Sequence, residues 1–418
     1  MTESSKRSIS EQIQPTKTLA GHSGNTVRSP LFLPFAMPKN PSPLLALALT
    51  LSLFSACTAK ESGMRSEPIR LGYIGPLTGD AVSFGTDTVN GARMAVEEVN
   101  AAGGMNGRKV SLIAEDGRCN GADAASAAQK LVNIDKVVAI IGGQCSSETL
   151  GAAPITEAAK VILLSPVSSN PDVTHAGEFV FRVYPSDALK GTALANYFAK
   201  SNFTKIAIIS ENTDFCKGIH DSIKDALKNG ASLVFDETVD PGTKDYRTLF
   251  TRLKDIDFDV FLVNGQSDST VAAMVQQMRE LGLTQPIVGT DTADSVTLGQ
   301  IAKEAVEGLR ALSVPSLSKS DPQGGPFVQT FEEKYGTPQV GFFFAALSYE
   351  ATRLLLETIG TVGTDGESLR DGLLGMNGYR SVIGTMTFDE FGDIEGIPFA
   401  LKEFKNGVLT EVERIPLH

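Results

Sequence analysis

The chain has 418 residues, of which 42% are hydrophobic and 21% are charged, and its formal net charge is −12 at pH 7. This length suits two domains, and the composition is that of a globular protein, which argues against a disordered one. A surface this acidic repels phosphate backbones, so we expect no nucleic acid partner. The histidines stand far apart and the sequence lacks HExxH, CxxC, GxxxxGK[ST] and GxSxG motifs. We therefore expect no metal site and no cofactor.

The N-terminal part of the chain has the features of an export signal. Residues 44–54 form an apolar run, which is too short for a membrane span of about 20 residues but typical of a signal peptide. Small residues then lead to Cys57, an arrangement that resembles the lipobox of bacterial lipoproteins, although Phe54 stands where leucine is usual. The pattern predicts a signal peptide over 37–56 and lipidation of Cys57. A buried helix followed by a free cysteine is the alternative interpretation.

The segments on either side of this signal are polar. Residues 1–36 are polar and have no apolar period, while Met37 is followed by a lysine just before the apolar run. We therefore predict that residues 1–36 are a non-native extension and that translation starts at Met37. Residues 57–67 read as a polar tether.

From residue 69 onward, short apolar runs alternate with amphipathic helical stretches. Such alternation indicates βαβ units and parallel sheets that are covered on both faces. Two series of this kind predict two doubly wound α/β lobes. The strands expected in the first series are 69–75, 109–114, 137–141 and 161–164, and those in the second are 205–210, 233–238, 260–264, 287–289 and 309–313.

The C-terminal part supplies further pieces of the same two lobes. Helices are expected over 327–335, 342–359 and 369–376, and Asn406-Gly407 is a strong hairpin signal within 399–413. Because this stretch has too few strands for a sheet of its own, we expect it to pack on both lobes. The chain then crosses between the lobes three times, near 184–187, 313–317 and 385–387. The expected parts are lobe 1 over 68–186 and 315–386, and lobe 2 over 187–314 and 387–418.

Polar residues follow several of these strands, at the edge where open parallel sheets bind ligands. The third strand leads into GGQCSSE, which includes Ser146, and the fourth leads into a loop with Ser168 and Ser169. Such serines can donate hydrogen bonds to a carboxylate, but each is equally compatible with a helix cap. Asp291 follows a strand of the second lobe, where it can pair with an ammonium group or can cap a helix.

The cysteines of the body divide into a pair and a single thiol. Cys119 and Cys145 follow strands expected to be adjacent, which in an exported protein suggests a disulfide. Cys216 then stays unpaired, and we expect a buried or half-buried thiol without a nucleophilic role.

From about residue 69 to its end, the chain resembles the leucine/isoleucine/valine-binding proteins, the extracellular receptors of branched-chain amino acid ABC transporters. The resemblance implies the type I periplasmic binding fold, with two doubly wound parallel-sheet lobes and three crossover segments. It rests on segments spread along the whole body: IRLGYIGPLTGD, FGTDTVNGARMAVEEVNAAGGMNGRKVSLIAEDGRCN, GGQCSSET, LLSPVSSNPDVT, FRVYPSD and SYEATRLLLETIG.

The resemblance also implies roles for individual residues. Ser146 and the loop of Val167, Ser168 and Ser169 hold the ligand carboxylate, and Asp291 faces the ligand ammonium. Phe84 and Phe215 close over the ligand at positions where tyrosine is common, and Gln266 lies at a strand end that is unusually polar. Leucine, isoleucine and valine are therefore the first expectation, with a polar or aromatic amino acid or an amide as the alternative. Family members have a disulfide near this site, and the resemblance places its cysteines at Cys119 and Cys145.

Together these features predict a monomeric solute-binding lipoprotein in the periplasm or at the cell surface. It captures an amino acid between its lobes and delivers it to the membrane permease of an ABC transporter, and the lipid anchor is its only membrane contact. A ligand-sensing receptor for an amide or amino acid is the first alternative. A hydrolase is the second, since His220 lies one helical turn after Cys216, but no oxyanion-hole loop accompanies the pair, so we expect no enzyme activity.

Overall fold

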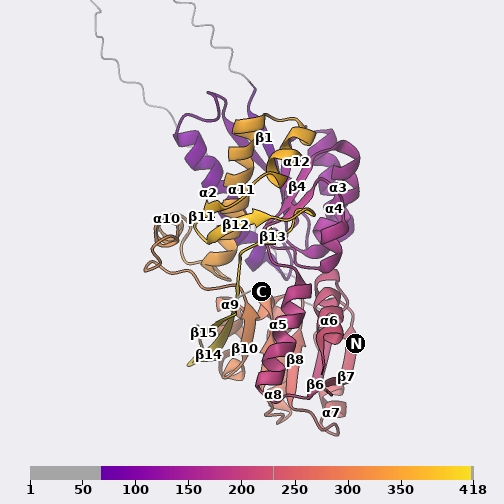
Figure 1. The fold of residues 1–418 in the computed structure, drawn as a ribbon. Helices are drawn as coiled ribbons and strands as arrows, with labels where there is room; N and C mark the ends of the chain where they lie inside the picture. The colour runs from indigo at the N-terminus through magenta and orange to yellow at the C-terminus, as the bar shows by residue number, and fades with distance from the viewer. Residues whose placement is uncertain (1–66, 229, 416–418) are drawn as a thin grey trace, which may run out of the picture. The chain divides into compact units, whose positions relative to one another are not determined.

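The computed structural model describes residues 67–228 and 230–415 (Figure 1). The predicted extension over 1–36, the signal peptide over 37–56, Cys57 and all of the tether but its last residue lie outside this part of the chain. Within the described residues, no helix combines the length and the apolar character needed to cross a membrane.

The first lobe is built on a sheet of five strands in the order β2-β1-β3-β4-β5, and every pairing is parallel. The first four strands were predicted, but β5 was missed. It is only three residues long and ends in Arg182, a charged residue that is fully buried and therefore breaks the apolar pattern. The strands are β1 (Ile69–Gly75), β2 (Val110–Asp116), β3 (Ala139–Ile141), β4 (Ile162–Ser165) and β5 (Val180–Arg182).

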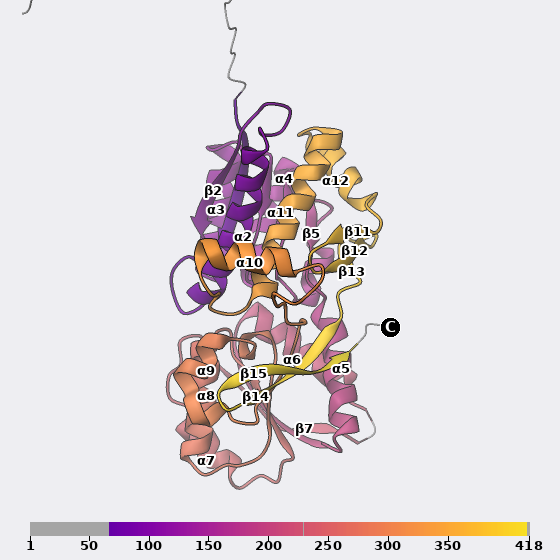
Figure 2. The ribbon, with the colours of Figure 1, turned by 90° about the vertical axis from the view of Figure 1, so that its left-hand side faces the viewer.

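Helices cover both faces of this sheet, as βαβ connections require. One face packs against α3 (Gly121–Asn133) and α4 (Ser146–Ala159) through residues such as Leu131 and Ile140. The other face packs against α2 (Val82–Ala101) and against α11 (Phe342–Val362). Figures 1 and 2 show α2 and α11 side by side although they are far apart in the sequence. Both α10 (Gly325–Tyr335) and α12 (Gly366–Leu374) complete this lobe.

The second lobe has a sheet of seven strands in the order β15-β14-β10-β9-β8-β6-β7. Its first five strands in sequence are parallel, and β14 and β15 add an antiparallel hairpin at one edge, joined at Asn406-Gly407 as predicted. The strands are β6 (Lys205–Glu211), β7 (Ser232–Val239), β8 (Val260–Asn264), β9 (Ile287–Gly289), β10 (Arg310–Ser313), β14 (Phe399–Lys405) and β15 (Val408–Ile415). The covering helices are α5 (Asp187–Lys200), α6 (Asp214–Ala226), α7 (Arg247–Leu253), α8 (Asp268–Glu280) and α9 (Val296–Ala302).

The chain between α12 and β14 differs from the expectation in two respects. It forms a small antiparallel sheet of β11 (Tyr379–Ser381), β12 (Gly384–Phe388) and β13 (Ile394–Glu395), where no separate sheet was expected. The third crossing between the lobes therefore falls at residues 396–398, later than the predicted 385–387 (Figure 2). Two kinds of contact keep this segment on the first lobe: the buried guanidinium of Arg182 in β5 binds Asp393, and apolar side chains such as Ile394 and Ile397 pack in the first-lobe core.

Candidate functional site

A cavity of about 40 Å³ lies between the two lobes, at the carboxyl ends of the parallel strands. Both lobes contribute to its wall. A larger groove beside α5 and α6 contains none of the predicted ligand-binding residues, so we regard the cavity between the lobes as the site. The first lobe contributes Ala81, Phe84, Gln144, Cys145, Ser146 and Val167, and the second contributes Phe215, Gln266, Asp291 and Thr292.

The start of α4 forms one side of this cavity. After β3 the chain turns through two glycines, and a Cβ atom on Gly143 would lie 2.3 Å from the Cβ of Glu148, so only glycine fits there. The Ser146 hydroxyl oxygen accepts a hydrogen bond from the backbone N–H of Asn170 at 3.2 Å, which leaves its own proton available to another acceptor. The first amides of a helix have no intrahelical partner and attract negative charge. This end of the cavity can therefore hold a carboxylate.

A disulfide joins Cys119 to Cys145, as predicted, with their Cα atoms 5.2 Å apart. The buried Glu148 carboxylate links the same two residues a second time, because it accepts the backbone N–H groups of Cys119 at 2.9 Å and of Cys145 at 3.0 Å. Burial raises the pKa of Glu148 to about 7, and the hydrogen bonds only partly oppose this rise. The disulfide and the carboxylate together fix the loop that leads into α4.

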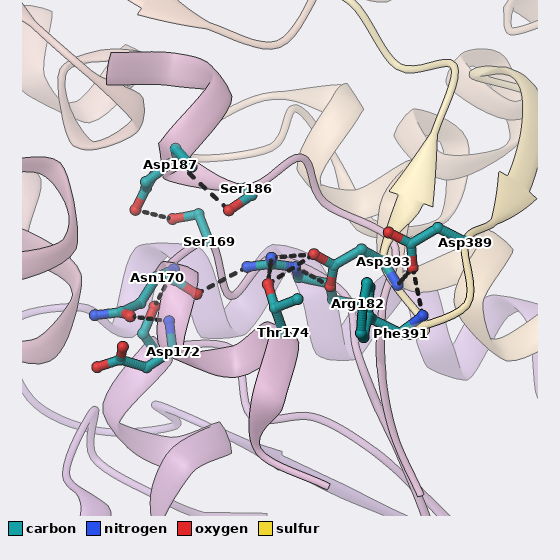
Figure 3. Close-up of polar contacts among 12 residues, drawn as sticks. Ser169, Asn170, Asp172, Thr174, Arg182, Ser186, Asp187, Asp389, Phe391 and Asp393 are labelled. Atoms are coloured by element: carbon teal, nitrogen blue, oxygen red, sulfur yellow. Dashed lines mark hydrogen bonds and ion pairs between the residues drawn. The ribbon is translucent and has the colours of Figure 1, made fainter. Parts of the chain in front are cut away.

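The loop after β4 contributes to the cavity through Val167, while the side chains of Ser168 and Ser169 bind protein groups instead. The Ser168 hydroxyl donates to the carbonyl of Gly143 at 3.0 Å. The Ser169 hydroxyl donates to the Asp187 carboxylate at 2.9 Å, and Figure 3 shows this contact at the start of α5. Neither serine side chain is part of the cavity wall, so in this closed arrangement the two serines support the loop.

Arg182 holds the next part of the loop in place (Figure 3). Its guanidinium donates to the carbonyl of Asn170 at 2.8 Å, to the Thr174 hydroxyl at 2.6 Å and to the Asp393 carboxylate at 2.6 Å. The Asn170 side chain in turn donates to the carbonyl of Asp214 in the second lobe at 2.5 Å. The loop beside the cavity is thus bonded to both lobes and to the segment before the third crossing.

Asp291 lies at the cavity wall, and its carboxylate already has protein partners. The Tyr184 hydroxyl donates to one of its oxygens and the Lys190 ammonium donates to the other. Lys190 also binds Asp187 at 3.0 Å, and its side chain is fully buried. Burial opposes the charged form of Lys190, but the two aspartates more than compensate and raise the pKa of its ammonium.

The charge of this buried cluster depends on its two carboxyls, and burial raises the pKa of Asp187 above its ordinary value. With both carboxyls ionised, Asp187, Lys190 and Asp291 contribute −1, +1 and −1, which leaves a net charge of −1. An excess charge in a buried site is costly unless an opposite charge compensates it. An ammonium group in the cavity beside Asp291 would make the cluster neutral. Asp291 is therefore suited to bind a cation even though it is paired with Lys190.

The remaining wall combines aromatic and amide side chains. Phe84 and Phe215 are almost fully buried, and Phe84 packs edge-to-face on Phe344 with their ring centroids 5.4 Å apart. The same wall includes Gln144 and Gln266. The side-chain carbonyl oxygens of both glutamines are buried and have no hydrogen-bond partner among the described residues. The wall therefore has hydrogen-bonding capacity that the protein itself does not use.

Cys216 is buried and lies outside the cavity wall. Burial raises the pKa of its thiol, which disfavours the reactive thiolate. His220 directs its ring nitrogens to Asp221 at 2.9 Å and to Asp236 at 3.0 Å. The described residues also include no cluster of three or more side chains suited to hold a metal ion.

Comparison with known proteins identifies the family. The model of the periplasmic binding protein family matches residues 68–394. The chain belongs to the periplasmic binding protein family. Members of this family bind solutes for transport and are not enzymes, so the hydrolase interpretation is set aside.

Several periplasmic binding proteins resemble this one over most of its length. The Leu/Ile/Val-binding protein of Escherichia coli (strain K12) is 29% identical over 352 residues, which cover 83% of this chain and 94% of that protein. A leucine-binding protein from Thermotoga maritima has 28% identity and a TM-score of 0.77, with 83% and 99% of the two chains covered. A branched-chain amino acid transporter substrate-binding protein from Streptococcus pneumoniae, solved in complex with isoleucine, has 27% identity, the same TM-score and the same coverage.

The structure brings six of the predicted ligand-binding residues together in the wall of this cavity, beside others that were not predicted. Gln144 was not predicted as a ligand-binding residue, because the unpaired state of its side-chain oxygen is visible only in three dimensions. Lys190 was missed because, at three residues after Asp187 on a helix, it looks like half of an ordinary surface ion pair. The predicted ligand-binding residues that the structure brings together in the cavity wall are Phe84, Ser146, Val167, Phe215, Gln266 and Asp291.

Proposed function

We propose that this periplasmic binding protein captures an α-amino acid between its lobes and delivers it to the permease of an ABC transporter. The observation that carries the proposal is the presence of Ser146 and Asp291 in the wall of one cavity, each contributed by a different lobe. Relatives named for leucine, isoleucine and valine binding support the ligand class.

In the proposed complex, the first lobe binds the carboxylate. The Ser146 hydroxyl and the first amides of α4 donate to it, and each hydrogen bond to a charged group contributes about 1.5–3 kcal/mol. Ser169 acts indirectly here, because its hydroxyl holds Asp187 next to Lys190. This revises the role that the resemblance implied for the side chains of Ser168 and Ser169.

The second lobe supplies the site for the ammonium at Asp291 and closes the cavity with Phe215. A ligand that contacts both lobes favours the closed arrangement, since only there are both sets of contacts made. The lobes already meet directly through the Ser83 hydroxyl, which donates to the Asp268 carboxylate at 3.0 Å. We propose hinge motion at the three crossings as the route by which the ligand enters.

We further propose that the protein is monomeric and works outside the cytoplasm, held at the membrane by a lipid on Cys57. The apolar run over 44–54 and the small residues before Cys57 support this export route. Mass spectrometry of the mature protein from its native membrane tests it, and an N-terminal diacylglyceryl-cysteine at position 57 is the expected result.

A ligand screen tests the binding function. We expect some of the common amino acids to raise the melting temperature, because a ligand of the folded state stabilises it. Isothermal calorimetry then gives the Kd, and Ser146→Ala is expected to raise it about tenfold or more through the loss of one charged hydrogen bond. The control is Ser126→Ala on the exposed side of α3, which should leave the Kd unchanged. Equal affinity in Ser146→Ala and the parent protein would reject the proposed carboxylate site.

A further inference from the structure

Two amide side chains, one from each lobe, belong to the wall of the cavity. Gln144 is in the first lobe and directly precedes Cys145, while Gln266 comes from the second lobe. The Gln266 side-chain nitrogen lies 3.9 Å from the sulfur of Cys145. Gln266 therefore approaches the start of α4, beside the residue that follows Gln144.

Neither amide carbonyl is satisfied by the protein. Gln144 is 5% exposed, and its side-chain oxygen and that of Gln266 are both buried without a hydrogen-bond partner among residues 67–228 and 230–415. Most buried polar groups in folded proteins are hydrogen-bonded, and an unpaired one is unfavourable. Two such groups on one cavity wall indicate that the ligand supplies the missing partners.

The charge around these amides limits what that partner can be. Among the described residues that line the cavity, Asp291 is the only ionisable one, and it is bound by Tyr184 and Lys190. A second charge on the ligand side chain would therefore find no free counter-ion in this wall, whose other members include two phenylalanines and two neutral amides. An aliphatic side chain would leave both carbonyl oxygens unpaired. A hydroxyl or carboxamide side chain avoids both costs.

We propose that Gln144 and Gln266 select amino acids whose side chain is neutral and forms hydrogen bonds, namely a hydroxyl or a carboxamide, over branched aliphatic ones. This inference rests on the proposed function, because it assumes that the α-carboxylate and α-ammonium groups bind at Ser146 and Asp291. Sites built to hydrogen-bond a ligand discriminate strongly against analogues of equal shape that lack the polar group.

Pairs of ligands with nearly equal shape provide the test. Threonine matches valine and asparagine matches leucine, so calorimetry on each pair isolates the polar contribution. We expect threonine or asparagine to bind at least tenfold more tightly than its partner. In Gln144→Leu and in Gln266→Leu this preference should fall at least threefold, whereas the exposed Gln323→Leu should keep it.

The possible outcomes separate this inference from the proposed function. If valine binds as tightly as threonine and leucine binds as tightly as asparagine, the inference is wrong while amino-acid binding stands. A polar preference that persists unchanged in both Gln144→Leu and Gln266→Leu would also overturn it. If none of these four amino acids binds, the inference fails, and if none of the common amino acids binds, the proposed function fails as well.

Discussion

Replacement of Asp291 by asparagine is the most direct test of the charge arrangement in the cavity. Asparagine has nearly the shape of aspartate and keeps one acceptor oxygen for Lys190, while its NH2 group can donate to the Tyr184 hydroxyl, so the packing of the cluster is preserved. The charge changes, because the cluster of Asp187, Lys190 and residue 291 goes from −1 to neutral. An incoming ammonium then introduces an unbalanced positive charge where it previously completed a neutral set.

The magnitude follows from the contact that is lost. A hydrogen bond between charged groups contributes about 1.5–3 kcal/mol, and about 1.4 kcal/mol corresponds to a factor of ten in Kd. We therefore expect Asp291→Asn to weaken binding of an amino acid by about 10-fold to 100-fold. The analogue of the same ligand without its amino group lacks this contact, and its affinity should change little.

The assay is calorimetry with both ligands on both proteins, which forms a double-mutant cycle. The ratio of the two affinities should be large in the parent protein and close to one in Asp291→Asn. Asp294→Asn is the matched control, because Asp294 is a buried aspartate paired with Lys402 outside the cavity wall. It is expected to lower stability and keep the ratio. An unchanged ratio in Asp291→Asn would refute the reasoning.

Two further predictions concern stability. The carboxyl of Glu148 has a pKa of about 7 in the folded protein against 4.5 ordinarily, so the folded state holds this proton more tightly and stability falls as pH rises from 4.5 to 7. At about 1.4 kcal/mol for each pKa unit, the free energy of unfolding should fall by about 3 kcal/mol over this range. Chemical denaturation at both pH values should show a smaller fall in Glu148→Gln than in the parent protein. An equal fall in the two proteins would contradict this prediction. Arg182→Met leaves Asp393 without its buried partner and should lower the free energy of unfolding by about 3–5 kcal/mol, whereas Arg247→Met, which breaks exposed pairs, should cost at most about 1 kcal/mol. Similar losses in the two arginine variants would contradict the role assigned to Arg182.

Much of the fold is predictable from the sequence because most of its central parallel strands are buried. Runs such as those of β1, β8 and β9 are mainly apolar, so their limits coincide with the predicted ones. The β5 strand escapes this pattern because Arg182 is buried by specific hydrogen bonds and not by its own hydrophobicity. The same arginine helps to hold the segment before the third crossing on the first lobe, through a contact with Asp393 far along the chain.

The locations of Ser146 and Asp291 were predictable because each comes shortly after a strand, which places it at the carboxyl edge of a sheet. Whether a side chain at that edge faces the cavity depends on its local partners. Ser169 turns to Asp187, and Lys190 reaches across to Asp291, and both contacts join segments whose proximity is set by the tertiary fold.

The position of α11 has a consequence for the order in which the chain folds. This helix covers one face of the first sheet, yet it begins at Phe342, long after the five strands of that sheet. If the chain leaves the cytoplasm from its N-terminus, those strands arrive outside before the helix that buries them. The first lobe must then wait, with apolar surface exposed, until most of the chain has been translocated. Chaperone protection during export should therefore matter most for the first lobe.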